Sequence, residues 1–466
     1  MTRTITVQPV TRIEGHAKIV LDVDGEDQVA RAHLQVLEMR GFEKLLQGME
    51  LFKVPLMVSR ICGVCPAAQH LAAVVAIEQG LGVQVPPDGQ ALRELLYMGH
   101  ILHSHALSVF VLCGPDILGN LGDKADARNL FHLLRVSPDL VKQLLRIRSI
   151  GQRVVETVGG RGVHPVTAMP GGMASRPSED ALAELARSGA EAVAALEPLG
   201  ESLRAKLAVL DEIHSTALDG FSALALSDGG AVSFLKGDWT VADPDGKPLR
   251  TFEAKDYADH LVERVSPGSY MKSVHLRGTP ESSFFVGPLA RLHLNTRMGT
   301  PKADAWLEAF RSKAPRRSPI DFIEARMVEM MHCAERISVL AASVGKGPIA
   351  VPCQPRAGRF VGAVEAPRGL LIHDYTADES GRVTKANMIV ATQNNYDAID
   401  ASLRSVGQIY LPRKDDELLM NRLEFSLRCF DPCLACATHA MGRMPMEVIV
   451  RQHGREDHRI SRSVQP

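Results

Sequence analysis

Two cysteine pairs with the same spacing carry the clearest chemical signal in this chain of 466 residues. Cys62 and Cys65 lie near one end of the sequence, and Cys433 and Cys436 lie near the other. A Cys-x-x-Cys pair can place two thiolates on one metal ion from a single turn of backbone. If the chain folds so that the two pairs meet, the four sulfurs would form one all-thiolate metal site.

The spacing of the pairs bears on what such a site would be. The two pairs of a structural zinc site usually lie a few tens of residues apart, whereas positions 65 and 433 are separated by most of the chain. A thioredoxin-type redox pair needs only one such motif, and it remains a minor alternative. Four soft thiolates suit zinc, iron or nickel, and because a thiolate can bridge two ions they could hold a two-metal centre. The spacing does not choose the metal.

Composition limits the class of partner. The chain has 53 basic and 54 acidic residues, with a net charge of -1 and no block of like charge, which argues against nucleic acid or an anionic membrane as partner. It has no 18-residue apolar run and no signal-peptide stretch at its start, so we expect a cytoplasmic protein without a membrane span. Cysteines 113, 333, 353 and 429 lie among apolar neighbours and are expected to be buried thiols.

The hydrophobic pattern predicts a mainly α protein with small antiparallel β-sheets, in the α+β class, with long helices at its core. Strands are expected at residues 5–10, 17–22 and 31–38, and hairpins within 230–256 and 370–392, the second turning at 378–381. Long helices are expected within 91–160, 178–215 and 320–344. Within the first region, a helix should start at Ser137-Pro138 and stop at Gly159-Gly160. The helix of the second region should bend at Pro198. The methionines of the third are expected to pack in the core.

Four further segments sharpen the metal hypothesis. They are RIEGH at residues 12–16, RGFE at 40–43, EAPRG at 365–369 and DPCLACATH at 431–439. With these motifs in order and the cysteine pairs at both ends, the chain resembles the large subunit of a [NiFe]-hydrogenase over essentially its whole length. Among subfamilies it resembles the cytosolic, bidirectional, NAD(P)-linked type most, and those joined to heterodisulfide reductase almost as much.

The resemblance implies roles for the cysteines. All four would bind nickel, and Cys65 and Cys436 would also bridge to an iron that carries carbon monoxide and cyanide. Cys62 and Cys433 would then be terminal ligands, and Cys433 would accept a proton when hydrogen splits. Glu14 would relay that proton, since a carboxylate in a dry site has a raised pKa. Outside its motif, Glu14 would be read as a solvated loop carboxylate.

The resemblance also implies roles for residues around the cysteines. Arg368 would hydrogen-bond one cyanide, with Pro367 packed beside it, and Thr392 would offer a hydroxyl to the other. Glu43 and His439 would bind a magnesium ion near the end of the mature chain, because such a hard ion prefers an oxygen-rich shell.

Two positions depart from the pattern of many relatives. Gln69 stands where a His often hydrogen-bonds a bridging sulfur, and His70 follows it. Gln can donate that bond but cannot carry a proton. Ser104 stands where uptake-type relatives have an Asp, so Arg368 would lack that carboxylate partner. We expect altered tuning of the site.

The chain divides into a catalytic unit, residues 1–439, and a C-terminal extension, residues 440–466. In the family a dedicated endopeptidase removes such an extension once nickel is in place, so this chain resembles a precursor that also needs nickel chaperones. The extension would keep the last cysteine pair away from the core until the metal arrives. The alternative is a permanent edge strand at Met446–Val450.

The electron path requires partners. The chain has no further cysteine set for an iron–sulfur cluster, so we expect a small subunit that bears such clusters and, behind it, a flavin-containing diaphorase module. Other readings are a hydrogenase linked to heterodisulfide reductase or ferredoxin, and a hydrogen sensor. A non-catalytic relative such as the quinone-site subunit of complex I is disfavoured because all four cysteines remain.

Overall fold

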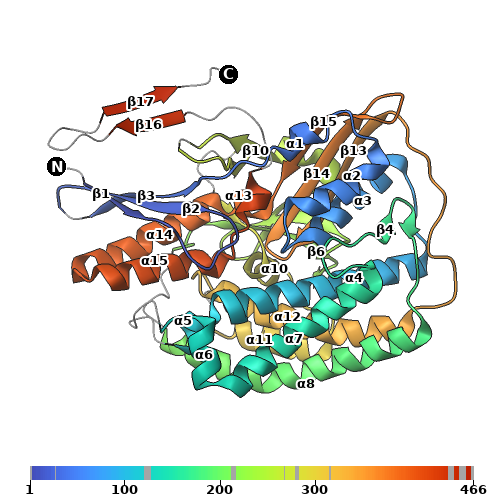
Figure 1. The fold of residues 1–466 in the computed structure, drawn as a ribbon, viewed down its shortest axis with the longest axis horizontal. Coiled ribbons are helices and arrows are strands. Elements are labelled where there is room, and N and C mark those ends of the chain that lie inside the picture. The colour runs from blue at the N-terminus through green and yellow to red at the C-terminus, as the bar shows by residue number, and fades with distance from the viewer. Residues whose placement is uncertain are drawn as a thin grey trace.

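The computed structural model describes residues 3–26, 28–119, 127–210, 217–266, 268–278, 283–313, 316–438, 446–450 and 458–462. Its centre is a layer of long helices that pack against one another (Figure 1). These helices are α4 (Pro87–Ala106), α7 (Pro138–Gly159), α8 (Glu179–Val209) and α12 (Asp321–Ser343). The predicted α+β class with a long-helix core is therefore confirmed.

The ends of these helices follow the sequence signals. Helix α7 begins with Pro138 directly after Ser137, and it ends at Gly160, whose φ of 77° few other residues tolerate. Helix α8 begins where the Ser178 hydroxyl accepts a hydrogen bond from the Ala181 amide at 3.2 Å. Pro198 lies inside α8, at the predicted position.

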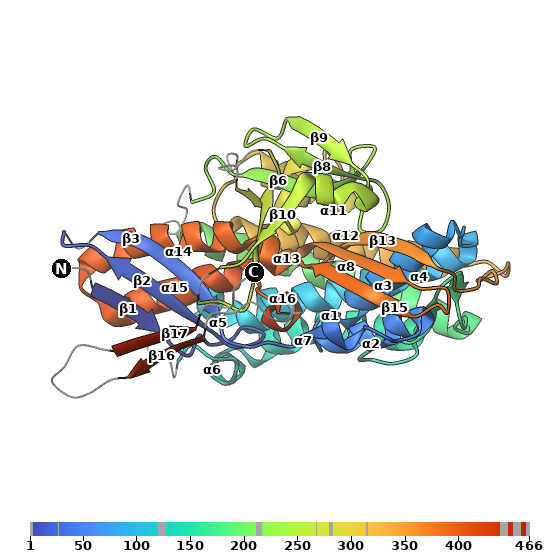
Figure 2. The ribbon, with the colours of Figure 1, turned by 90° about the horizontal axis from the view of Figure 1, so that it is seen from above.

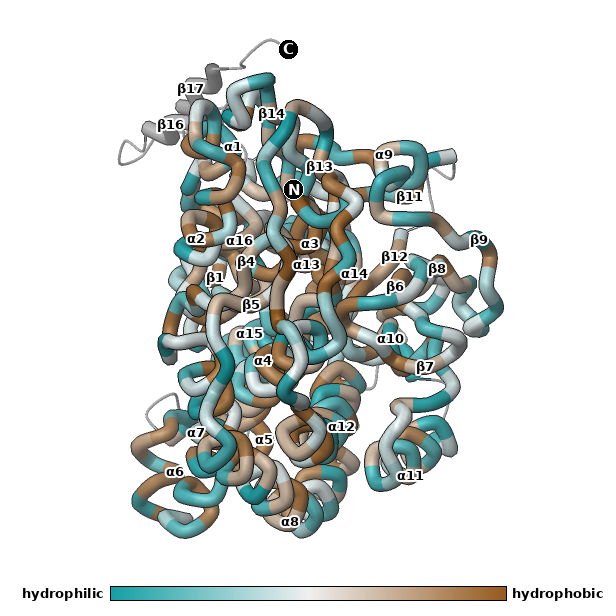
Figure 3. The backbone as a smooth tube through the Cα atoms, turned by 90° about the vertical axis from the view of Figure 1, so that its right-hand side faces the viewer, coloured by the Kyte–Doolittle hydropathy of each residue, from teal (hydrophilic) through white to brown (hydrophobic). Residues whose placement is uncertain are grey.

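Helix α12 crosses the middle of the layer. Its methionines, including Met327, Met330 and Met331, are buried, so the prediction that they pack in the core is confirmed. At the edge of the molecule, α6 (Leu130–Val136), α7 and α8 alternate between hydrophilic and hydrophobic residues, as amphipathic surface helices do (Figure 3).

An antiparallel sheet at one end of the molecule consists of β1 (Arg3–Val7), β2 (Ala17–Val23) and β3 (Val29–Val36). Alternate residues of β2 are buried, and α14 (Tyr396–Tyr410) covers this sheet beside α15 (Asp416–Phe430). The three predicted N-terminal strands are confirmed, and the sheet brings the start of the chain against the helices that lead to Cys433.

A second antiparallel sheet consists of β13 (Gly358–Ala366), β14 (Gly369–Ala377) and β15 (Val383–Ile389), and its β14–β15 turn is the predicted one at 378–381. Helix α3 (Pro66–Leu81), which follows the first cysteine pair, packs on β13. The tight β13–β14 turn holds Pro367 and Arg368, so this sheet places the EAPRG motif beside the cysteines.

A smaller β-rich segment stands on the helical layer (Figure 2). It contains a five-stranded sheet of β6 (Ser222–Asp228), β7 (Ala231–Val232), β8 (Asp238–Ala242), β9 (Pro248–Phe252) and β12 (Phe284–Phe285), and the pair β10 (Leu261–Arg264) and β11 (Ser273–Leu276). The predicted hairpin within 230–256 is therefore part of a larger sheet.

Short elements complete the described chain. They are α1 (Phe42–Leu45), α2 (Val54–Val58), α5 (Gly114–Leu118), the pair β4 (Ala168–Met169) and β5 (Gly172–Met173), α9 (Tyr257–His260), α10 (Pro288–Leu294), α11 (Pro301–Arg311), α13 (Ala391–Asn394), α16 (Leu434–Ala437) and the hairpin of β16 (Met446–Val450) and β17 (His458–Arg462). The strand predicted at 446–450 is present and pairs with β17.

Two burial findings bear on the sequence expectations. Cys113, Cys333 and Cys429 are buried as predicted, whereas Cys353 is partly exposed, so the prediction was wrong for that thiol. Among the described residues, one helical stretch, Pro87–Leu112, is long and apolar enough to cross a membrane, and 83% of its most apolar window is buried inside the protein. A core helix has the same properties.

Candidate metal centre

The two cysteine pairs meet in one buried cluster. The sulfur of Cys65 lies 3.1 Å from that of Cys436 and 3.8 Å from that of Cys433, and the sulfur of Cys62 lies 3.3 Å from that of Cys433. All four sulfurs lie within 4.8 Å of one another. The predicted meeting of the chain ends is therefore confirmed.

Each pair is placed by the start of a helix. Cys65 caps the N-terminus of α3, and Cys62 ends the short 3-10 turn at Ser59–Ile61. Cys433 caps the N-terminus of the short α16 in the same way. The positive end of the dipole of the sixteen-residue α3 lies at Cys65, where it would favour a metal-bound thiolate.

The sulfur geometry fits a metal centre. Metal–sulfur bonds of about 2.3 Å separate neighbouring sulfurs by roughly 3.3 to 3.8 Å, depending on the bond angle. Two of the observed separations, 3.3 and 3.8 Å, fall in this range, the third is slightly shorter at 3.1 Å, and the cluster contains no disulfide. Within the described ranges, no other group of three or more His, Cys, Asp or Glu side chains is arranged to hold a metal. The site is thus a soft, four-thiolate one.

The thiols of the cluster share protons unequally. Hydrogen bonds from Cys433 and the other two cysteines lower the pKa of Cys62 well below that of an ordinary thiol. The hydrogen bonds with Cys436 and the other thiols, together with burial, raise the pKa of Cys433 well above its usual value. A bound metal would displace these protons, since only thiolates are good ligands.

Glu14 lies against the second pair. Its backbone forms a parallel bridge with Cys433, its carbonyl accepts a hydrogen bond from the Leu434 amide at 3.2 Å, and its Oε2 accepts one from the Ala435 amide at 2.9 Å. Burial, and then the negative charge of Cys62, raise the pKa of Glu14. The carboxylate is only partly buried, so it lies between the sulfur cluster and the protein surface.

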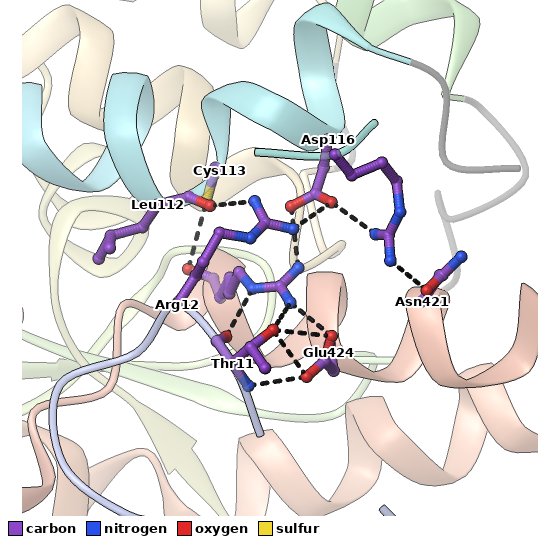
Figure 4. Close-up of polar contacts among 9 residues, drawn as sticks. Thr11, Arg12, Leu112, Cys113, Asp116, Asn421 and Glu424 are labelled. Atoms are coloured by element: carbon purple, nitrogen blue, oxygen red, sulfur yellow. Dashed lines mark hydrogen bonds and ion pairs between the residues drawn. The ribbon is translucent and has the colours of Figure 1, made fainter. Parts of the chain in front are cut away.

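A network of charged residues holds the segment that carries Glu14 (Figure 4). Arg12 has a positive φ of 55° and donates from Nη2 to Asp116 Oδ1 at 2.7 Å and from Nη1 to the Leu112 carbonyl at 2.6 Å. Arg128 donates to the same Asp116 oxygen at 3.0 Å. Two cations therefore converge on one fully buried carboxylate of α5.

The same network reaches the helix before Cys433. Arg428 of α15 donates to Asp116 Oδ2 at 2.9 Å and to Glu424 Oε2 at 2.6 Å, and Glu424 Oε1 accepts from the Thr11 amide at 2.7 Å (Figure 4). The N-terminal motif, α5 and α15 are thus joined by charge-assisted hydrogen bonds. This fixes Glu14 and Cys433 relative to each other.

Arg368 extends from the β13–β14 turn toward the cluster. It is 4% exposed and donates from Nε to the Asp431 carbonyl at 2.6 Å, from Nη2 to Asp431 Oδ1 at 2.9 Å and from Nη1 to Ser104 Oγ at 3.3 Å. Burial opposes its charge, but the carboxylate of Asp431 and the thiolates of Cys433 and Cys65 raise its pKa above the ordinary value.

Ser104 offers Arg368 a hydroxyl and no carboxylate, whereas Asp431 supplies a carboxylate partner from another part of the chain. Helix α4 continues as a π-helical turn at Leu107–Leu112, which begins three residues after Ser104. Such turns are frequent at functional sites, because they change the direction in which a helix presents its side chains.

Thr392 and Gln69 also have defined partners. Thr392 Oγ1 accepts a hydrogen bond from the Cys433 amide at 3.0 Å, so it lies at the cluster. Gln69, one helical turn after Cys65, pairs its Oε1 with His373 Nε2 at 2.8 Å. His70 instead bonds the carbonyls of Pro55 at 3.0 Å and Ala168 at 2.8 Å, and therefore does not replace the histidine of relatives.

Glu43 lies in α1, where its Oε1 accepts a hydrogen bond from the Met388 amide at 2.9 Å. His439 lies outside the described residues. The preceding Thr438 carbonyl accepts hydrogen bonds from the amides of Arg40 at 3.0 Å and Gly41 at 3.2 Å. Thr438 therefore lies beside the start of the helix that carries Glu43.

Sequence reasoning assigned no role to two residues that the structure places at the centre. Asp431 stands in a quoted motif, but only the fold shows that it pairs with Arg368. Asp116 lies in no motif, and its three arginine partners come from distant parts of the chain. For Asp431, the sequence offered one signal, its position two residues before a cysteine pair. For Asp116, the sequence offered no signal.

Comparison with known proteins agrees with this geometry. The family described as nickel-dependent hydrogenase matches residues 40–129, and the one described as HoxL-like matches residues 4–39. The chain is 34% identical to the beta subunit of the NAD-reducing hydrogenase HoxS of Cupriavidus necator, with 97% of each chain covered. It is 35% identical to a subunit of the F420-non-reducing hydrogenase vhu of Methanocaldococcus jannaschii, with 87% of this chain and 99% of that one covered. A crystal structure of an NAD+-reducing [NiFe]-hydrogenase in the H2-reduced state superimposes with a TM-score of 0.90 at 32% identity, with 94% of this chain and 99% of that chain covered.

Proposed function

This chain belongs to the family of [NiFe]-hydrogenase large subunits, and from that premise we propose that it activates H2 reversibly in a cytoplasmic complex that delivers the electrons to NAD(P). The observation that carries the proposal is the buried cluster of Cys62, Cys65, Cys433 and Cys436, whose sulfurs lie within 4.8 Å of one another. The chain is an enzyme subunit of the hydrogenase type, and a four-thiolate site suits its nickel.

The four cysteines would hold a nickel–iron centre, with Cys65 and Cys436 bridging the two metals and carbon monoxide and cyanide on the iron. When bound, this centre supplies heterolytic cleavage of H2 and takes up its electrons. The chain's own residues then handle the proton. Glu14 is bridged to Cys433 through the backbone, and it would carry the proton from Cys433 Sγ toward the surface.

Arg368 would act as a fixed cation over the centre. Two of its donors are satisfied by Asp431, and its planar fork can present a remaining N–H to an anionic ligand such as cyanide. Thr392 would orient the second pair through its bond to the Cys433 amide, and its hydroxyl hydrogen remains available to the other cyanide. Pro367 fixes the turn before Arg368.

We further propose that Glu43 and His439 bind a magnesium ion. The hydrogen bonds from Arg40 and Gly41 to the Thr438 carbonyl support this, because they hold the residue before His439 beside α1. A hard ion with carboxylate and water ligands would tie the end of the catalytic unit, residues 1–439, to the body of the protein. Residues 440–466 would be removed by a maturation endopeptidase after nickel chaperones have loaded the site.

The electrons need an exit. All eight cysteines are described, and the four outside the cluster are not arranged as a metal site, so an iron–sulfur small subunit would carry the electrons onward. A flavin-containing diaphorase module would then reduce NAD(P). The similarity to the NAD-reducing relative supports this acceptor. The chain is comparably similar to an F420-non-reducing hydrogenase that is not named for NAD, so a complex linked to heterodisulfide reductase or ferredoxin is kept as a second candidate.

The test is hydrogen oxidation by the complex purified without oxygen. We expect nickel in this chain, together with H2-dependent reduction of NAD+ or NADP+ at a rate comparable with that of viologen reduction. Reduction of viologen alone would reject the pyridine nucleotides and favour the second candidate. Absence of nickel would reject the proposed enzyme. So would very slow turnover with every acceptor, as expected of a hydrogen sensor.

A further inference from the structure

Arg291, at the centre of the fold, is 0% exposed and uses every one of its five N–H donors. Nε and Nη2 donate to the two carboxylate oxygens of Glu329 at 2.6 and 2.7 Å. Nη1 donates to Glu365 Oε2 at 2.6 Å and to the Ala366 carbonyl at 3.2 Å. Nη2 also donates to the Pro367 carbonyl at 3.2 Å. The guanidinium thus holds the β13–β14 turn directly before Arg368.

The contacts of Arg291 form a closed path back to Arg368. Glu329 Oε2 also pairs with His105 Nε2 at 2.7 Å. His105 follows Ser104, whose hydroxyl accepts a hydrogen bond from Arg368 Nη1 at 3.3 Å. The turn and Arg368 are therefore held by Arg291 of α10 on one side and by Ser104 of α4 on the other, and Glu329 contacts both Arg291 and the residue after Ser104.

The start of α10 presses on the same turn. The Gly287 carbonyl accepts the amide hydrogen of Arg291 at 2.9 Å, so the two residues belong to one helical turn. A Cβ atom at Gly287 would lie 2.6 Å from the Arg368 carbonyl oxygen. The backbone carrying Arg291 is therefore in close contact with the backbone carrying Arg368, and neither can move alone.

The charges make this arrangement rigid. Burial disfavours a carboxylate at Glu329, but the charge of Arg291 outweighs it and lowers the pKa of Glu329 to about 2. Burial raises the pKa of Glu365 to about 7 even though Arg291 lies beside it. A lysine has three rotating donors and no planar fork, so it cannot make the five bonds of Arg291.

We propose that Arg291 is a positioning residue for Arg368: by holding the Ala366 and Pro367 carbonyls, it fixes the turn from which the Arg368 guanidinium reaches Asp431 and the sulfur cluster. The geometry of the turn does not depend on the proposed function. Only the spectroscopic part of the test does.

Arg93 offers a matched control. It is also a buried arginine that pairs with one carboxylate, Glu78, through two bonds of 2.6 Å. It also donates to two backbone carbonyls, those of Met169 at 2.8 Å and Gly172 at 2.9 Å. Arg93 therefore holds the β4–β5 turn as Arg291 holds the β13–β14 turn, but it lies about 16 Å along α4 from Ser104.

The first measurement is amide hydrogen exchange of the metal-free full-length chain. R291K is expected to speed exchange at residues 366–370 at least roughly tenfold and to leave residues 170–174 unchanged, whereas R93K is expected to do the reverse. Equal exchange at 366–370 in R291K and the wild-type chain would overturn the proposal. So would a loss of protection throughout the chain in R291K with none in R93K.

The second measurement is infrared spectroscopy of the nickel-loaded complex. R291K is expected to shift the cyanide bands and to lower hydrogen oxidation roughly 10- to 100-fold, since a misplaced catalytic group costs factors of this size. R93K is expected to keep both. If the wild-type complex lacks nickel, the proposed function fails while the exchange result still stands.

If the R291K protein does not fold or is not produced in the cell, a third variant can test the proposal. Glu365→Gln keeps the side-chain volume and an oxygen for the Leu226 amide, which donates to Glu365 Oε1 at 2.9 Å, but it replaces the oxygen that accepts from Arg291 by an NH2 group that can only donate. It is expected to give the same localised exchange at 366–370 and the same direction of cyanide shift. Unchanged bands and exchange in E365Q would overturn the proposal.

Discussion

Glu14 and Ala435 are joined by a 2.9 Å hydrogen bond from the Ala435 amide to the Glu14 carboxylate, although one lies near each end of the chain. Beside this bond, the backbones of Glu14 and Cys433 form a parallel bridge, in which the Leu434 amide donates to the Glu14 carbonyl at 3.2 Å. The backbone itself therefore sets the distance between Cys433, which is proposed to give up the proton, and Glu14, which is proposed to receive it. No side-chain rearrangement is needed to bring them together.

Replacing Glu14 by Gln should stop proton transfer and spare the fold. The amide oxygen of Gln can still accept from Ala435, but Gln cannot bind and release a proton. We expect wild-type nickel content and melting temperature with hydrogen turnover reduced roughly 100-fold or more. Glu14→Asp serves as the control and should retain part of the rate. A full rate in E14Q would show that the proton leaves by another route.

Each of the four clustered cysteines should be required for nickel. A serine hydroxyl is a poor ligand for a soft ion, so C62S, C65S, C433S and C436S should each purify with little or no nickel by elemental analysis. Cys353→Ser is the matched control, because this thiol only donates to the Pro170 carbonyl at 3.2 Å. Retention of full nickel in any of the four would contradict the assignment of that ligand.

Asp431→Asn should remove the negative charge of Asp431 and keep its backbone conformation. Asp431 has a positive φ of 55°, which Asn also tolerates, and the Asp431 carbonyl would still accept from Arg368 Nε. We expect an intact fold, retained nickel and a fall in turnover of roughly tenfold or more, because Arg368 loses its only paired carboxylate within the described residues. An unchanged rate and unchanged cyanide bands would mean that this ion pair does not tune the site.

His332 should make the protein less stable in mild acid. Burial lowers its pKa to about 4, while an exposed histidine titrates near pH 6.5. Between these values the unfolded chain binds a proton that the folded chain does not. The contribution is therefore complete above about pH 6.5 and is lost as the pH falls toward 4.

The variant His332→Gln isolates this effect, since Gln can keep a bond to Thr300, which lies 3.3 Å from His332 Nδ1. At pH 5 the histidine should cost the wild-type chain on the order of 2 kcal/mol relative to pH 7. The melting temperature should therefore drop more steeply between pH 7 and 5 for the metal-free wild-type chain than for H332Q. Parallel curves would mean that His332 is protonated in the folded state.

Removal of residues 440–466 should accompany nickel loading. Mass spectrometry of the large subunit from the active complex should show a chain about 3 kDa lighter than the metal-free form, ending at His439. Withholding nickel during expression should leave the full-length chain. A full-length chain in an active, nickel-containing complex would make the β16–β17 hairpin a permanent part of the enzyme.

The sequence predicted the elements with strong local signals. The Ser137-Pro138 start and Gly160 end of α7 and the 378–381 turn are set by backbone conformations that few residue types allow, so they could be placed from sequence. The ligand set was predicted because Cys-x-x-Cys is a local pattern. The two cysteine pairs come together because β3 packs on α14, which in turn packs on α15. This tertiary packing could not be predicted from the sequence.

The polar residues that orient the site could not be predicted in the same way. Asp116 has three arginine partners that lie 12 to 312 positions away in the sequence, and Arg291 lies 74 positions from Glu365. Such bonds depend on tertiary contacts that leave no periodic trace. The pairing of Arg368 with Asp431 could not be predicted for this reason, since Asp431 reaches Arg368 from another element.

The division of the ligands between the two cysteine pairs has a consequence during synthesis. Domains begin to fold from the N-terminal side while the ribosome is still adding residues. The helical layer and the first two thiols can thus form before Cys433 exists. A product of premature termination would fold in large part yet lack half of its sulfur ligands, so the architecture itself excludes incomplete chains from acquiring nickel.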